Sequence, residues 1–117
     1  MRKSVILTLA LLCFMLSGCA ETQVQKNNDA LLQLEMGMSK DQVISVMGKP
    51  SLNEAYQSLN GKAVVIYRYV TQLAFPPRST IHREDTTPVV FENGKLVGWG
   101  AEFYKHKLEI DVNIKNN

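Results

Sequence analysis

The two histidines are the residues best suited to acid–base or metal chemistry, but their surroundings indicate neither. His82 and His106 lie far apart in the sequence, and neither has a companion at a ligand spacing. A zinc site needs three or four convergent ligands. Glu84 and Asp85 stand close to His82, but with Arg83 they are typical of a charged, solvated loop. We therefore expect no metal site.

The hydroxyl groups and the glycines also lack the patterns of catalysis. Ser58, Ser79 and Thr80 do not have the surroundings of an activated nucleophile. The glycines of the second half fall in a hairpin pattern rather than in a phosphate-binding loop. A hydrolase would need His82 or His106 to converge with a carboxylate and a hydroxyl. We expect no enzyme activity and no cofactor.

The N-terminal segment carries a different chemistry, that of an exported protein. Arg2 and Lys3 form a basic start, and residues 5–16 are apolar except for Thr8. This run of about twelve residues is too short to cross a membrane, which needs ~20. It fits the apolar region of a signal peptide. We expect residues 1–18 to be removed.

The end of that segment resembles the lipobox of bacterial lipoproteins. Its four residues are Leu16, Ser17, Gly18 and Cys19. The resemblance implies that a signal peptidase recognises Leu16, Ser17 and Gly18 and cuts before Cys19. It also implies that Cys19 carries diacylglycerol on its sulfur and a further acyl chain on its new amine. The alternative is an ordinary signal peptide with a chance cysteine.

The cysteine count agrees with a lipid anchor. Cys13 lies in the removed segment and Cys19 would carry lipid, so the mature chain has no thiol for a disulfide or a metal. Several acyl chains anchor a protein durably, whereas one does so only marginally. Ala20 stands where an aspartate would favour the inner membrane. The resemblance therefore implies the outer membrane, with the domain facing the periplasm.

Chain length and net charge limit the number of domains and the classes of function that remain possible. A chain of 117 residues with 45% hydrophobic residues allows one domain with a packed core. Arg2 and Lys3 account for two of the thirteen basic residues, so the mature chain has eleven basic and eleven acidic residues. A neutral chain argues against nucleic-acid binding and against a polybasic membrane patch.

The first half of the mature chain predicts a tether and two short helices. Residues 19–28 indicate the lipidated cysteine followed by a flexible polar tether. Asn28 or Asp29 can cap a helix over residues 30–36, which ends at Gly37.

Residues 37–50 predict the second helix. Ser39 is a good N-cap, and Gln42 completes a capping box. Gly48 and Pro50 end the helix. Its apolar side needs a partner surface, and it consists of Val43, Ile44, Val46 and Met47.

The second half predicts an antiparallel meander of three to five strands. The expected strands are residues 54–59, 63–73, 87–92 and 95–103, with type I′ turns at Asn60-Gly61 and Asn93-Gly94. Gly98 and Gly100 flank Trp99 and indicate a bulge or a close approach of the backbone. Residues 108–115 alternate and indicate a fifth strand at the sheet edge, or an edge offered to a partner. The fold class is α+β, with a single domain over residues 29–117 whose helices cover one face of the sheet.

Residues 37–50 also carry a family resemblance. Gly37-Met38-Ser39, Val43 and Met47-Gly48-Lys49-Pro50, followed by two hairpins, resemble the SmpA/OmlA family of small outer-membrane lipoproteins. The resemblance covers roughly residues 31–99, and a member of that family belongs to the β-barrel assembly complex. The GKLVGWG ending is similar to an uncharacterised branch of short Gram-negative lipoproteins. The resemblance implies a role in outer-membrane assembly or integrity.

One long connection is the candidate surface for a protein partner. Residues 74–86 combine an aromatic residue with cationic ones, as protein-recognition surfaces do. The candidates are Phe75, Arg78, His82 and Arg83. The alternative is a solvated loop without a role. Trp99 also has two interpretations, either core packing or an exposed anchor for a partner.

These observations favour a non-enzymatic, membrane-anchored module that binds another protein of the cell envelope. The alternative is a small-ligand or peptidoglycan-binding module. That alternative predicts a deep pocket lined by Tyr67, Tyr69 or Trp99.

Overall fold

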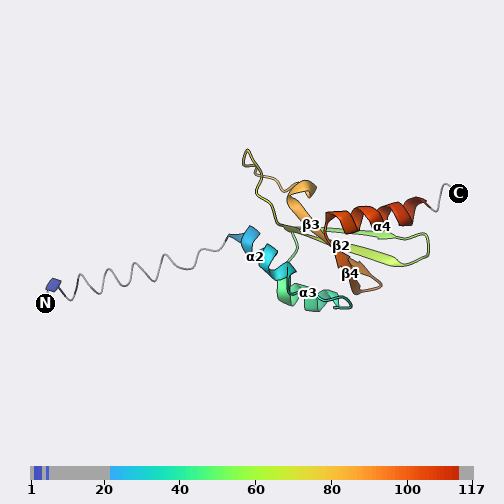
Figure 1. The fold of residues 1–117 in the computed structure, drawn as a ribbon, viewed down its shortest axis with the longest axis horizontal. Helices are drawn as coiled ribbons and strands as arrows, with labels where there is room; N and C mark the ends of the chain where they lie inside the picture. Colours follow the sequence, from blue (N-terminus) through green and yellow to red (C-terminus); the bar gives the residue numbers. More distant parts are fainter. Residues whose placement is uncertain (1, 4, 6–21, 114–117) are drawn as a thin grey trace.

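The computed structural model describes residues 2, 3, 5 and 22–113, and residues 22–113 form the predicted α+β fold. Its elements are α2 (Gln23–Leu31), α3 (Lys40–Met47), β1 (Leu52–Gln57), β2 (Ala63–Val70), the 3₁₀ turn η1 (Arg83–Asp85), β3 (Thr86–Glu92), β4 (Lys95–Trp99) and α4 (Ala101–Asn113). The four strands pair as an antiparallel meander in the order β1-β2-β3-β4 (Figure 1). The predicted meander is confirmed.

Helices α2 and α3 cover one face of the sheet. The core on this face contains Ala30 of α2, Leu34 of the connection between the helices, and Val43 and Met47 of α3, which pack against Tyr69, Val89, Phe91 and Leu96 of the strands. Because these apolar side chains leave water together, their burial is the main stabilising term for this face.

The predicted capping of α3 is confirmed. The Gln42 N–H donates to the Ser39 hydroxyl at 3.2 Å, and the Ser39 N–H donates to the Gln42 side chain at 2.9 Å. Gly48 ends the helix with φ of +80°, which a glycine adopts without strain. Ile44 differs from its predicted role, because 38% of it is exposed.

The predicted tether and first helix are wrong in their bounds. A helix covers residues 23–31, where we expected a flexible segment up to residue 28 and a helix over 30–36. Thr22 caps α2 in a capping box with Gln25. Asn27 is buried in the contact with β2, so tertiary contacts stabilise a helix of low apolar content.

The predicted fifth strand is also wrong, because residues 101–113 form α4. The fourth strand ends at Trp99 instead of Phe103, since Gly100 turns the chain with φ of +105°. Helix α4 covers the second face of the sheet, where Phe103 and Tyr104 pack on a cluster of Val64, Ile66 and Val90. The sheet therefore has helices on both faces instead of one.

Gly98 marks a close approach, as its position predicted. A Cβ atom on Gly98 would lie 2.5 Å from Cζ of Phe103. Only a glycine lets the α4 aromatic ring rest on the strand.

One of the two predicted type I′ turns is confirmed. Asn93 and Gly94 both have positive φ, of 48° and 81°, as that turn requires. The prediction for Asn60-Gly61 is wrong, because among the described non-glycine residues only Asn93 has positive φ. The chain there makes a longer loop in which the Gly61 N–H donates to the Ser58 carbonyl at 2.9 Å.

The two edges of the sheet differ. The outer edge of β4 pairs with the segment before α3, since the Gly37 N–H donates to Leu96 and the Leu96 N–H donates to Met38, both at 2.8 Å. Within residues 22–113, no segment pairs with the outer edge of β1.

Candidate functional site

The β2–β3 loop (residues 71–85) contains the predicted partner-binding residues, and its base is closed by hydrogen bonds. The Asp85 carbonyl accepts from the N–H groups of Thr71 at 3.0 Å and Gln72 at 3.1 Å. The hydroxyls of Thr71 and Thr87 lie 2.7 Å apart. Long surface loops whose ends meet in this way are often functional. The loop is therefore an ordered projection from the sheet.

An ion pair between Arg78 and Asp85 braces the loop from inside. Arg78 Nη2 donates to both carboxylate oxygens of Asp85, at 2.7 and 2.6 Å, and Nη1 donates to Glu84 at 3.1 Å. The hydrogen bond that Arg78 donates to Asp85 is the main cause that raises the pKa of the Arg78 guanidinium above its ordinary value. Asp85 is buried, and a buried carboxylate needs such a partner. The Arg78 charge is thus neutralised within the loop.

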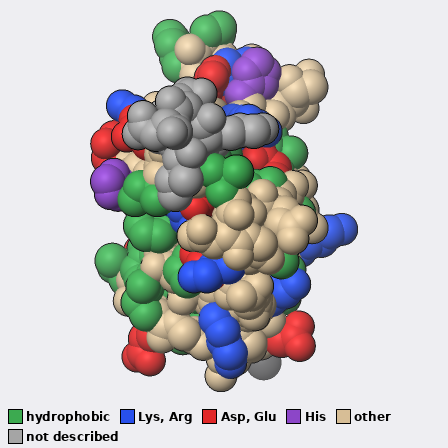
Figure 2. All heavy atoms as spheres, turned by 90° about the vertical axis from the view of Figure 1, so that its right-hand side faces the viewer, with side chains coloured by type: hydrophobic (Ala, Val, Ile, Leu, Met, Phe, Trp, Pro, Cys, Tyr) green, Lys and Arg blue, Asp and Glu red, His purple; other side chains and the backbone are tan. Residues whose placement is uncertain are grey.

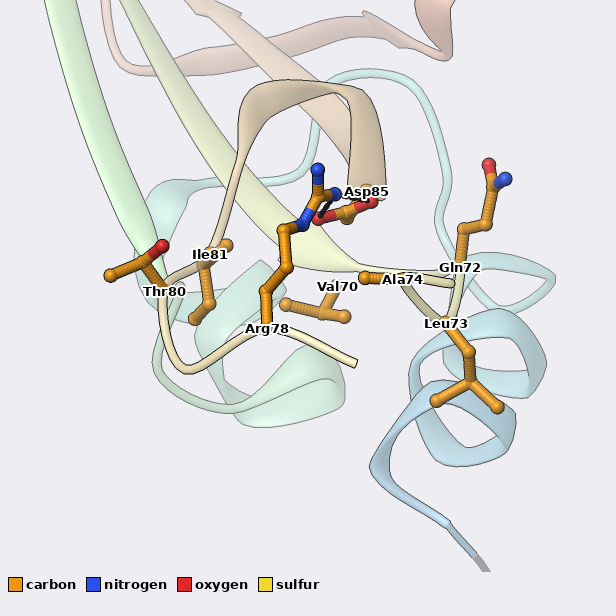
Figure 3. Close-up of a pocket in the computed structure, with 8 residues that line it drawn as sticks. All are labelled: Val70, Gln72, Leu73, Ala74, Arg78, Thr80, Ile81 and Asp85. Atoms are coloured by element: carbon orange, nitrogen blue, oxygen red, sulfur yellow. Dashed lines mark hydrogen bonds and ion pairs between the residues drawn. The ribbon is translucent and has the colours of Figure 1, made fainter. Parts of the chain in front are cut away.

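A small pocket lies beside this ion pair. It has a volume of about 180 Å³ and is lined by Val70, Gln72, Leu73, Ala74, Arg78, Thr80, Ile81 and Asp85. Figure 3 shows Arg78 extended toward Asp85 at this pocket. Small-molecule sites usually enclose ~300–1,000 Å³. The pocket is suited to one side chain rather than to a larger ligand.

The apolar tip of the loop, Leu73 and Phe75, projects into solvent. Leu73 is 72% exposed and Phe75 is 97% exposed. Figure 2 shows hydrophobic side chains on the uppermost projection of the molecule, which is the position of this loop in Figure 1. Only Ala74 separates the two, so the loop exposes two large apolar side chains close together in the sequence.

His82 lies between a hydroxyl and a carboxylate. Its Nε2 is 3.3 Å from the Thr80 hydroxyl, and its Nδ1 is 3.5 Å from Glu84 Oε1. This is the order of groups that a hydrolytic triad has. However, the distances are long, the three side chains are exposed, and the same Glu84 oxygen also accepts from Arg78. We read the trio as a polar cluster at the loop surface.

The second histidine does not join the first. His106 lies on α4, where it lines a separate pocket of about 180 Å³ with Phe103, Lys107, Ile110 and Asp111. Over residues 22–113, no three histidine, cysteine, aspartate or glutamate side chains gather as a metal site would require.

Arg83 attaches the loop to the sheet through Glu54, a contact that the sequence analysis did not identify. Oε1 of Glu54 accepts from Arg83 Nε at 2.8 Å and from Arg68 Nε at 3.0 Å. Arg68 is buried, and its guanidinium lies 4.8 Å from the ring centre of Tyr104 on α4. An arginine inside the otherwise apolar β2 sequence was the available signal. The three charges connect the loop, the sheet and α4.

The aromatic residues expected for a small-ligand pocket belong to the core. Tyr69 is 1% exposed, and its hydroxyl donates to the Gly48 carbonyl at 2.9 Å. Burial raises the pKa of Tyr69 to about 12. Tyr67 contacts Phe91 edge-on, and Trp99 packs against the same cluster. Of the two roles considered for Trp99, the structure shows core packing. At Tyr69, where the small-ligand alternative requires a deep pocket, the space is filled by packed side chains.

Helix α2 is fixed to the base of the loop. The Asn27 side chain donates to the Val70 carbonyl at 2.8 Å, and the Asn28 side chain donates to the Thr71 carbonyl at 3.0 Å. The start of α2 and the β2–β3 loop consequently lie at one end of the molecule, opposite the β1–β2 turn (Figure 1).

The predicted lipidation site lies outside the described residues. This holds for Cys19 and for the peptidase-recognition residues Leu16, Ser17 and Gly18. In the part of the chain that the structure describes, every helix is too short or too polar to span a bilayer.

A known protein family matches most of the chain. A family model described as a protein of unknown function, DUF3192, matches residues 19–106. No curated protein and no solved structure matches the chain. Since the matched residues make up most of the sequence, the chain belongs to the DUF3192 family.

Proposed function

We propose that this chain is an outer-membrane lipoprotein that faces the periplasm and acts as a non-enzymatic protein-interaction module of the cell envelope. The lipobox at residues 16–19 carries this proposal, because it directs export and converts Cys19 into a lipid anchor. The resemblance to the SmpA/OmlA family gives outer-membrane assembly or integrity as the process served.

The described surface supports binding to a protein better than binding to a small ligand. The pocket at Arg78 is small, and the aromatic residues of the sheet are in the core. His82 and Arg83 are exposed on the β2–β3 loop. Arg83 is also joined to β1 through Glu54, so it stands beside the strand whose outer edge has no partner within residues 22–113. We propose His82, Arg83 and the β1 edge as the protein-binding surface.

Two measurements test this function. Metabolic labelling with palmitate should mark the protein, and Cys19→Ala should abolish the label and release the protein from the membrane fraction. A photo-crosslinking amino acid at Arg83 should trap a discrete envelope protein. The same probe at Lys105, an exposed residue of α4, is the matched control. An unlabelled protein, or identical adducts at both positions, would contradict the proposal.

A further inference from the structure

We propose that the apolar tip, Leu73 and Phe75, inserts into the surface of the lipid bilayer and fixes the orientation of the domain. This inference rests on the proposed lipidation of Cys19. It assigns the four predicted loop residues to different roles: Phe75 to lipid, Arg78 to the internal ion pair, and His82 and Arg83 to a protein partner.

The length of chain before α2 brings the domain close to the membrane. Thr22, the cap of α2, is the third residue after Cys19 in the sequence. An extended chain spans at most ~3.6 Å per residue, so Cys19 lies within about 11 Å of the cap. A lipid on Cys19 therefore places the start of α2 at the membrane surface.

The contacts of α2 bring the loop to the same surface. Asn27 is four residues beyond Gln23, a distance of about 6 Å along the helix axis. Asn27 and Asn28 bond directly to Val70 and Thr71, where the β2–β3 loop begins. Since Asn27 is also buried, α2 cannot swing away from the loop without breaking these contacts. The start of α2 and the loop share one end of the domain (Figure 1).

The chemistry of the tip suits the interface of a bilayer. Residues 73–77, Leu-Ala-Phe-Pro-Pro, contain no charged group. The next residue, Arg78, is neutralised by Asp85 and Glu84, so the tip enters the lipid without carrying a free charge. Moving Phe75 and Leu73 out of water is favourable, because both are large, exposed apolar side chains. That gain is small for binding alone and adequate for orienting a domain already anchored.

The orientation has a consequence for the protein-binding surface. With the tip in the lipid, the β1–β2 turn at the other end of the sheet points away from the membrane (Figure 1). The domain then presents the β1 edge to the periplasm in a fixed direction.

A fluorescent probe at the tip tests this inference. The acylated mature chain has no free thiol, so Phe75→Cys creates a single labelling site for the environment-sensitive dye NBD. The acylated protein is reconstituted into vesicles of phosphatidylethanolamine and phosphatidylglycerol. We expect blue-shifted emission and several-fold stronger quenching by nitroxide lipids than for NBD at Leu59→Cys, an exposed residue of the β1–β2 turn. Equal, weak quenching at both positions would overturn the inference.

Further measurements distinguish failure of the membrane contact from failure of the proposed lipidation. NBD at Ile81→Cys, an exposed loop position, should lose most of its quenching when Leu73 and Phe75 are both replaced by serine. The mass of the purified protein reports acylation independently of the dye. An acylated protein with a tip in water would overturn the membrane contact and leave the proposed function standing. An unacylated protein would overturn the proposed function, and the tip is then tested on protein coupled through Cys19 to a maleimide lipid. A photo-crosslinker at position 75 that yields a protein adduct instead of lipid adducts would also overturn the inference.

Discussion

The side-chain amide of Asn27 donates a hydrogen bond to the main-chain carbonyl of Val70, with 2.8 Å between the two atoms. The Asn27 oxygen in turn accepts from the Gln23 side chain at 2.9 Å. A buried asparagine thus adds a polar bond to the apolar packing between α2 and the end of β2. The position of the β2–β3 loop relative to the N-terminal helix depends on this bond.

Asn27→Ala should destabilise the domain by about 1–3 kcal/mol, because it leaves the Val70 carbonyl without its donor in a buried contact. Urea unfolding measures the loss. Asn28→Ala is the matched control, since exposed Asn28 bonds the Thr71 carbonyl where water can replace it. We expect that variant to lose less than about 0.5 kcal/mol. Equal losses would show that burial of Asn27 does not matter.

Gly98→Ala should destabilise the domain by about 1–3 kcal/mol, because the new methyl group would overlap the Phe103 ring. Thermal unfolding of the single variants and of Gly98→Ala combined with Phe103→Ala measures the coupling. We expect Gly98→Ala to cost far less when the ring is absent. Additive losses would mean that α4 does not rest on Gly98.

Arg68→Met and Arg83→Met should differ widely, although both arginines donate to the same Glu54 oxygen. Arg68 is buried and contacts Tyr104, so its removal should cost about 3 kcal/mol. The Arg83 side chain is 68% exposed, and its pair should contribute less than about 1 kcal/mol. Chemical unfolding of the two variants side by side is the measurement. A larger loss for Arg83→Met would contradict the assignment of Arg68 as the residue that holds α4.

Stability should fall in acid through Glu92. Its hydrogen bond from Lys107 is the main cause that lowers the pKa of this carboxyl below the ordinary value of 4.5. Since the folded state prefers the charged form, the contribution is present above the unfolded pKa and is lost as the pH falls through the folded pKa. Glu92→Gln should make the unfolding free energy less dependent on pH below about 4.5.

Lysine variants identify which partner causes that dependence. Lys107→Met should remove more of the pH dependence than Lys62→Met. The Lys107 ammonium lies 2.7 Å from a Glu92 carboxylate oxygen and its side chain is 13% exposed, whereas the Lys62 ammonium lies 3.1 Å from Glu92 and its side chain is 51% exposed. Equal effects would contradict the dominant role of Lys107.

Local signals made α3 and most of the meander predictable. The capping residues Ser39 and Gln42 and the terminator Gly48 act within one short segment, so no distant contact is needed to recognise the helix. Helix α2 has a similar box at Thr22 and Gln25, but its low apolar content concealed it. Its stability comes from the bond between Asn27 and Val70, which are distant in sequence.

The C-terminal helix could not be separated from a strand by periodicity alone. Residues 108–115 alternate as a half-buried strand would, but Ile110 is 51% exposed. The residues that hold α4 to the sheet follow helical spacing, with Lys107 bonded to Glu92 and Asp111 bonded to the Tyr56 hydroxyl. Such polar contacts carry no hydrophobic pattern and become visible only with both partners in place.

The candidate loop was predictable in its place but not in its internal pairing. Its length and composition marked Phe75, Arg78, His82 and Arg83 in the sequence. The structure adds that Arg78 is occupied by Asp85 and that Arg83 is bonded to Glu54. Aspartate and glutamate usually lie on the surface, so the sequence did not mark Asp85 and Glu54 as partners of these arginines. Only the folded structure shows which charges are paired.

The pairing of Gly37 and Met38 with Leu96 limits how copies of this domain can join through their backbones. In the described residues, one side of the sheet is already occupied and only the β1 side can accept another strand. A fibre of many copies joined edge to edge needs an unpaired strand at both edges of the sheet in every copy. Backbone pairing between folded copies therefore stops at a closed two-fold dimer, and growth into a fibre requires the residues before α3 to detach first.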